Sequence, residues 1–187
     1  MLEFKDLFNG SGLKIIPQIE YDLASIEDIG LTFIEHVLLK TRYAAQMTGL
    51  SAIADNSGLT VDTLNGVPGI YSARYAELNA SDSENIKKLL HEMKEVPDTE
   101  CSAQFHCVLI CLKHPADAIP SILHSKWLSI ITFSYQEPKK AEGFSYDPVF
   151  YLPELERTAA ELSIEEKSVI SHLSEALRQF LDVMRNV

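Results

Sequence analysis

The sequence predicts an α/β fold, because segments with helical spacing alternate with strand-like segments along the whole chain. Two segments, 31–47 and 83–93, carry apolar residues on one helical face. Two runs rich in branched and aromatic residues, 102–112 and 121–135, are typical of strands. With 187 residues, of which 46% are apolar, the chain is long enough to bury a sizeable core as one domain.

The first part of the chain begins with helical spacing over 2–8, which ends at Gly10-Ser11-Gly12. A strand is predicted over 14–19, and the acidic segment 20–28 is predicted to be a loop. The helix over 31–47 follows, with apolar residues at 34, 37, 38, 44 and 47.

The stretch Ala-Asp-Asn-Ser-Gly, 54–58, poses the main question of the sequence. A short apolar run at 51–54 predicts a strand that ends at Asp55, and Asn56-Ser57-Gly58 predicts a turn. An alternating strand over 59–64 then ends at the turn signal Asn65-Gly66. Carboxylates at the end of a strand are a usual way to present acid groups to a metal or a phosphate, yet an amide stands among them.

The second part of the chain predicts a helix over 83–93 and an antiparallel pair of strands, 102–112 and 121–135, joined by a loop with two prolines. The final segment opens with a capping box, Ser163 to Glu166, and continues with apolar residues at helical spacing as far as Met184.

The composition limits the classes of ligand that the protein could bind and indicates the compartment in which we expect it. The formal net charge of −11 makes a nucleic acid polymer an unfavourable partner, whereas a small phosphorylated ligand remains compatible if a cation and local lysines reverse the sign in one pocket. The three cysteines have neither disulfide nor zinc spacing, so we expect buried or half-buried thiols. No apolar run approaches membrane-spanning length, and the expected location is cytoplasmic.

Four stretches together resemble the inosine/xanthosine triphosphate pyrophosphatases, which hydrolyse non-standard purine nucleoside triphosphates to the monophosphate and pyrophosphate. The stretches are GLTFIEHVLLKTRYAAQMTGLSAIADNSGLTVDTLNGVPGIYSARY, FHCVL, GFSYDPVFYLP and TAAELSIEEKSVISHLSEALRQF. The resemblance implies a central twisted mixed sheet with flanking helices, two lobes around a nucleotide cleft, a homodimer and a Mg²⁺ requirement. It also implies one domain over 1–187 that lacks the family's first strand.

The resemblance assigns the site residues by position. Asp28, Asp55 and Asn56 fall at metal-binding positions, and Asn56 also falls at the position of the general base. The substrate-binding positions are Lys40, Ser57, Gly58, Phe144, Asp147, Lys167 and His172. In this group, Phe144 matches the aromatic residue that stacks on the purine.

Three departures from the family pattern fall where the chemistry would occur. Asn56 stands where the family has its second Asp, and Leu173 where it has an Arg that helps to read the 6-keto group. The family's Ser/Thr-x-x-Asn-x-x-Lys loop, which grips the triphosphate, falls before Met1. The loss of the strand that carries this loop is expected to leave a gap or an unpaired edge in the sheet.

The departures predict weak catalysis. Asn56 can offer its carbonyl oxygen to Mg²⁺ but cannot accept a proton near neutral pH, and the loss of a general base costs about 10²- to 10⁴-fold in rate. The expected function is therefore a strongly impaired nucleoside triphosphate pyrophosphohydrolase. The alternative is an inactive paralogue that binds nucleotide or serves as a dimer partner. Simpler interpretations also stay open, in which Asn-Ser-Gly is only a turn, Phe144 and Tyr146 are core aromatics, and Lys40 is solvated.

Overall fold

The computed structural model describes residues 14–24, 30–136 and 143–185. Its helices are α2 (Phe33–Thr48), α3 (Asp82–Glu92), α4 (Ile164–Ile170) and α5 (His172–Arg185), and its strands are β1 (Ala52–Val61), β2 (Ser102–Leu112), β3 (Ser121–Ile131), β4 (Phe150–Leu152) and β5 (Arg157–Thr158). Short 3-10 turns connect them: η1 (Gln18–Tyr21), η2 (Asp62–Leu64), η3 (Gly69–Arg74), η4 (Asp98–Glu100), η5 (Asp147–Val149) and η6 (Ala159–Glu161). The helix predicted at 2–8 lies outside the described residues.

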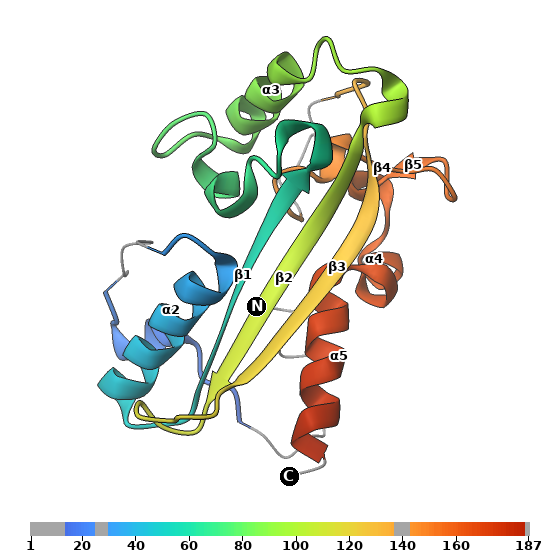
Figure 1. Ribbon diagram of the computed structural model, residues 1–187. Helices are drawn as coiled ribbons and strands as arrows, with labels where there is room; N and C mark the ends of the chain where they lie inside the picture. Colours follow the sequence, from blue (N-terminus) through green and yellow to red (C-terminus); the bar gives the residue numbers. More distant parts are fainter. Residues whose placement is uncertain (1–13, 25–29, 137–142, 186–187) are drawn as a thin grey trace. The chain divides into compact units, whose positions relative to one another are not determined.

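In the described part of the chain, the strands form one five-stranded sheet in the order β1-β2-β3-β4-β5 (Figure 1). Two side-chain pairs, Thr60 with His106 and Asp62 with Gln104, show that β1 and β2 run antiparallel, because one number rises as the other falls. Strand β4 pairs antiparallel with both β3 and β5. The α/β class is confirmed, but the expectation of a mixed sheet is corrected, since the described strands are antiparallel.

The contacts divide the chain into two compact units. Of the described residues, unit 1 contains those up to Ser57, those of the segment Cys107–Ser125 and those from His172 onward, and unit 2 contains those within Gly58–His106 and Lys126–Ser171. Strands β1, β2 and β3 each contribute one part to each unit. This division leaves the single domain over 1–187 a prediction.

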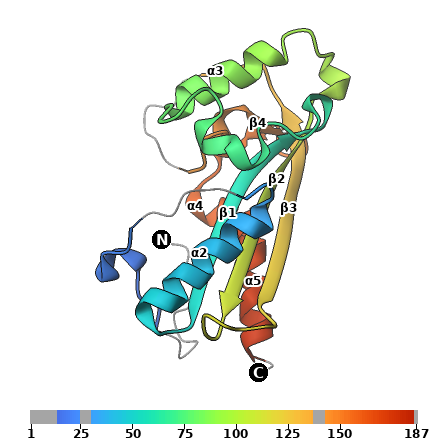
Figure 2. The ribbon, with the colours of Figure 1, turned by 60° about the vertical axis from the view of Figure 1, so that its left-hand side comes forward.

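Unit 1 has three layers, with its part of the sheet between α2 and α5 (Figures 1 and 2). Alternate residues of β2 face the two helices. Cys107 and Leu109 pack with Leu177 of α5, whereas Val108 and Ile110 pack with Val37 of α2. The near-continuous apolar run of β2 is therefore explained by burial on both faces.

Unit 2 contains a core that is rich in aromatic residues. Phe105 of β2 stacks on Phe150 of β4, with ring centroids 4.0 Å apart, and Trp127 of β3 lies 5.3 Å from Phe150. Helix α3 contributes Ile86 and Leu89 to this cluster. These contacts form the core against which the segment 143–149 packs.

Several local predictions are confirmed. The helices predicted over 31–47 and 83–93 are observed, with slightly shifted ends, as α2 and α3. The Asn65-Gly66 turn has the positive φ angles, 55° and 85°, that its sequence favours. Ser163 and Glu166 form the predicted capping box of α4. The three cysteines are free thiols, of which two are buried and Cys111 is half-buried. In the described part of the chain, helices lack the length and apolarity to span a membrane.

Three local predictions are wrong. Residues 14–19 are not a strand: an irregular stretch leads to Pro17, which lacks an amide donor, and η1 follows. The predicted turn at Asn56-Ser57-Gly58 is instead the middle of β1, because pairing with β2 overrides the local turn preference. The final helical segment divides at Ser171, whose ψ of 156° is extended, into α4 and α5.

Candidate functional site

The strand geometry of β1 separates the side chains of Asp55 and Asn56. Successive residues of a strand point to opposite faces of the sheet. Ile53 packs against the cluster that contains Leu177 of α5, whereas Ala54 packs against the cluster that contains Val37 of α2. By this alternation, Asp55 and Ser57 leave the strand on the face of Ile53, and Asn56 leaves it on the face of Ala54. The sequence prediction of a turn concealed this separation.

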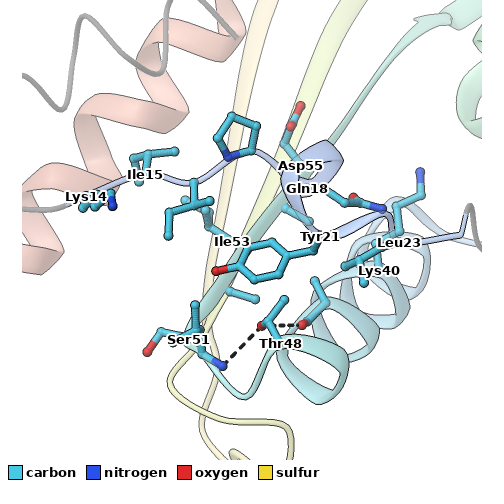
Figure 3. A pocket seen from close by; sticks show the side chains of 16 residues that line it. Lys14, Ile15, Gln18, Tyr21, Leu23, Lys40, Thr48, Ser51, Ile53 and Asp55 are labelled. Carbon is cyan, nitrogen blue, oxygen red and sulfur yellow. Dashed lines mark hydrogen bonds between the residues drawn. The ribbon is translucent and has the colours of Figure 1, made fainter.

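A cavity of about 360 Å³ in unit 1 brings two of the predicted site residues together, Lys40 of α2 and Asp55 of β1. Lys14 and Lys40 come from different walls of this cavity, and the Tyr21 ring lies between them (Figure 3). The volume is within the usual range for a small-molecule site. A lysine and a carboxylate that line one cavity are groups that could bind phosphate and a cation, respectively.

The segment 143–149 of unit 2 contains a buried ion pair. Asp147 is 1% exposed, and its Oδ2 accepts a hydrogen bond from the Phe144 amide at 2.8 Å and contacts the Lys167 ammonium. Its other oxygen, Oδ1, is buried and has no hydrogen-bond partner among the described residues. Burial raises the pKa of the Asp147 carboxyl, and the charge of Lys167 opposes that shift. The pair therefore presents an unused acceptor beside an ammonium donor.

Gly143 is a site feature that sequence reasoning missed. Its φ is +100°, and a Cβ at this position would lie 2.3 Å from Asp147 Oδ2 and 3.1 Å from Lys167 Nζ. A side chain here would collide with the ion pair. The available signal was a glycine directly before Phe-x-Tyr-Asp, where close approach of the backbone explains the residue type.

The two aromatic residues of this segment differ in their surroundings. Phe144 is partly buried and meets Phe105 edge to face, with centroids 5.0 Å apart. Tyr146 is fully buried, and its hydroxyl donates to the Ser72 carbonyl at 2.8 Å. Tyr146 is thus a core aromatic, as the simpler interpretation held, whereas stacking of Phe144 on a purine stays a prediction.

His172 and Leu173 begin α5 in unit 1. His172 is buried, and its carbonyl accepts a hydrogen bond from the Ser125 hydroxyl. Leu173 packs against the cluster that contains Cys107 and Leu109. Leu173 therefore has a packing role, which the comparison of motifs alone did not indicate.

Of the three predicted metal ligands, the structure describes Asp55 and Asn56. Asp28 lies outside the described residues. Within the described ranges, no group of three or more His, Cys, Asp or Glu side chains could hold a metal. Mg²⁺ commonly binds through one or two carboxylates together with substrate phosphates, so the single carboxylate of Asp55 in the cavity fits its chemistry.

Comparison with known proteins identifies the family to which the chain belongs. The sequence profile of the Ham1 family matches residues 1–183. The dITP/XTP pyrophosphatase of Yersinia pestis is 50% identical over 184 residues, which cover 98% of this chain and 92% of the relative, and that of Pectobacterium atrosepticum is 51% identical with the same coverage. A solved HAM1 protein from Coxiella burnetii has a TM-score of 0.90 at 43% identity, covering 100% of this chain and 93% of that one. The Staphylococcus aureus Ham1 protein has a TM-score of 0.87 at 36% identity, covering 99% and 92%. The chain belongs to the Ham1 family.

Proposed function

We propose that this chain is a nucleoside triphosphate pyrophosphohydrolase of the ITP/dITP/XTP type, which converts the triphosphate to the monophosphate and pyrophosphate. The observation that carries the proposal is the buried Asp147–Lys167 pair, with Asp147 Oδ1 lacking a partner in the described part of the chain. Relatives at half identity that are named dITP/XTP pyrophosphatases support the reaction class.

The ion pair matches the hydrogen-bonding edge of a 6-keto purine. Such a base presents an N1–H donor beside the O6 acceptor, whereas adenine presents the reverse order. An ionised carboxylate only accepts and a lysine only donates, so Asp147 would take N1–H and Lys167 would donate to O6. An adenine in the same place would leave buried polar groups unpaired, which is a strong basis for rejection. Phe144 would supply the stacking face for the base.

The triphosphate would bind through the remaining predicted residues. Lys40 would offset phosphate charge from the cavity of unit 1, with Ser57, Gly58 and His172 as further contacts. Mg²⁺ would be held by Asp55 and by Asp28, and it would supply charge neutralisation at the phosphates. Asn56 leaves β1 on the other face, so the proposal assigns it no direct ligation beside Asp55, and its general-base position rests on the resemblance alone.

Turnover requires a water to attack the α-phosphorus while the bond to the bridging oxygen breaks and pyrophosphate leaves. The water must lose a proton, and the Asn56 amide cannot accept it. We therefore propose activity about 10²- to 10⁴-fold below that of an enzyme with a carboxylate base. The homodimer and the cytoplasmic location remain parts of the proposal. The second candidate is an inactive paralogue that retains nucleotide binding, which the amide at 56 favours.

The test is pyrophosphate release from inosine and xanthosine triphosphates with Mg²⁺, with adenosine triphosphate as the comparison substrate. Native protein, Asn56→Asp and the matched control Asn65→Asp, which alters an exposed turn, are assayed together. We expect weak native activity, a gain of about 10²-fold or more in Asn56→Asp, and no gain in the control.

Other outcomes decide between the two candidates. An enzyme-like native rate would show that another group activates the water. If all three proteins are silent but inosine triphosphate raises the melting temperature, the binding paralogue is favoured. Silence without any such shift contradicts both candidates.

A further inference from the structure

Ser72 is a buried junction in unit 2 that the predicted site did not include. It lies in η3 and is 3% exposed. Its Oγ accepts a hydrogen bond from the Leu59 amide at 2.9 Å and donates to the Gly69 carbonyl at 2.6 Å. Its own carbonyl accepts from the Tyr146 hydroxyl at 2.8 Å. One serine thus joins β1, the turn that opens η3 and the segment 143–149.

The Tyr146 hydroxyl is the buried anchor of the segment 143–149. Tyr146 is 0% exposed and stands directly before Asp147, which in turn accepts from the Phe144 amide. Ser145 also holds the segment, by donating to Asp82 at 2.6 Å, but that hydrogen bond is exposed. An exposed bond exchanges readily with water, whereas loss of the Tyr146 bond would leave the buried Ser72 carbonyl without its partner.

We propose that Tyr146 and Ser72 are positioning residues that hold Phe144 and Asp147 in the arrangement that receives the base. The identity of the base rests on the proposed function, but the ordering of the segment does not. Neither residue is required to touch the ligand. Their loss should therefore weaken recognition of the base without weakening recognition of the phosphates.

The first experiment measures amide hydrogen exchange in the native chain and in Tyr146→Phe, which removes only the hydroxyl. Tyr71→Phe is the matched control, because Tyr71 is half exposed and lies one residue before Ser72. The Phe144 and Asp147 amides are the reporters, since each is hydrogen-bonded within the segment. We expect their exchange to accelerate about tenfold in Tyr146→Phe, with core amides of β2 unchanged. Ser72→Ala should act in the same direction.

The second experiment compares binding of inosine triphosphate with binding of inorganic triphosphate, both with Mg²⁺, by calorimetry. In Tyr146→Phe we expect the Kd for inosine triphosphate to rise about tenfold while the Kd for inorganic triphosphate stays unchanged. Equal changes for both ligands, or none for inosine triphosphate, would overturn the role in recognition.

The two readouts separate failure of this inference from failure of the proposed function. If the native chain binds no inosine triphosphate, the proposed function falls, and the exchange of Phe144 and Asp147 alone decides whether the segment is positioned in this way. Unchanged exchange in both variants would overturn the inference whatever the nucleotide result.

Discussion

Removal of the Lys167 ammonium should lower the free energy of unfolding, because it leaves the buried Asp147 carboxylate without its cationic partner. Lys167→Met keeps much of the apolar stem and removes the charge and the hydrogen-bond donor. The two side chains are 16% and 1% exposed, so water cannot readily replace the lost partner. Breaking a buried ion pair by removing one member costs about 3–5 kcal/mol when the other member stays ionised. That value is the expected loss of unfolding free energy at pH 8.

The loss should depend on pH in a direction that follows from the pKa of Asp147. Burial already places this pKa above the ordinary value of 3.8, and Lys167 opposes the shift. Removal of Lys167 therefore raises the folded-state pKa further. A group with a raised folded pKa contributes full stability below its unfolded pKa, and that contribution is lost as pH rises through the folded pKa. Lys167→Met should thus lose little stability near pH 4 and progressively more toward pH 8.

Urea unfolding of native protein and Lys167→Met at pH 4, 6 and 8 measures the effect as a difference between the two proteins. Lys94→Met is the control, because that lysine is 61% exposed and its partner Glu95 is 88% exposed. The double variant Asp147→Asn/Lys167→Met should recover most of the loss at pH 8, since no buried charge remains. A loss that is equal at all three pH values, or absent at pH 8, would refute the argument from burial.

Two further substitutions test the surroundings of the site. Gly143→Ala should cost about 1–3 kcal/mol by urea unfolding, because it combines a left-handed φ with a Cβ 2.3 Å from Asp147 Oδ2. Gly49→Ala, with φ +68° but no atom within 4 Å of the new Cβ, should cost less unfolding free energy. Equal losses in the two variants would show that the protein avoids the contact with Asp147 at no cost in free energy. Leu173→Arg introduces the residue that the resemblance predicts here, but it places a charge in the cluster of Cys107, Leu109 and Leu177, so we expect a loss of about 1–3 kcal/mol. A stable Leu173→Arg protein with improved preference for inosine over adenosine triphosphate would contradict the packing role.

The sequence predicted best those elements whose signal is local. Helices α2 and α3 have amphipathic spacing of their apolar residues, and Ser163 and Glu166 form the capping box of α4. The same Ser/Thr-x-x-Glu pattern at Thr32 and Ser81 caps α2 and α3 and could have sharpened their starts. Such signals depend on hydrogen bonds between residues close in the chain, so they are readable without the fold.

The errors arose where distant contacts override local preference. Asn56-Ser57-Gly58 favours a turn by composition, yet β2 pairs with this stretch and keeps it extended. The role of Ser72 was equally hidden, because its partners Leu59 and Tyr146 lie 13 and 74 residues away. The acidic and basic members of the ion pair were identified from the family resemblance, but the burial of Asp147 and the constraint on Gly143 required coordinates.

The continuous strand at 52–61 also bears on how this protein could have changed over time. An Asn codon and an Asp codon differ by one nucleotide, so residue 56 can pass between amide and carboxylate in a single step. Because Asn56 and Asp55 project from opposite faces of β1, that step need not displace the neighbouring carboxylate or interrupt the strand. On the proposed function, one point mutation at residue 56 would lower or raise the rate of hydrolysis about 10²- to 10⁴-fold without a change of fold.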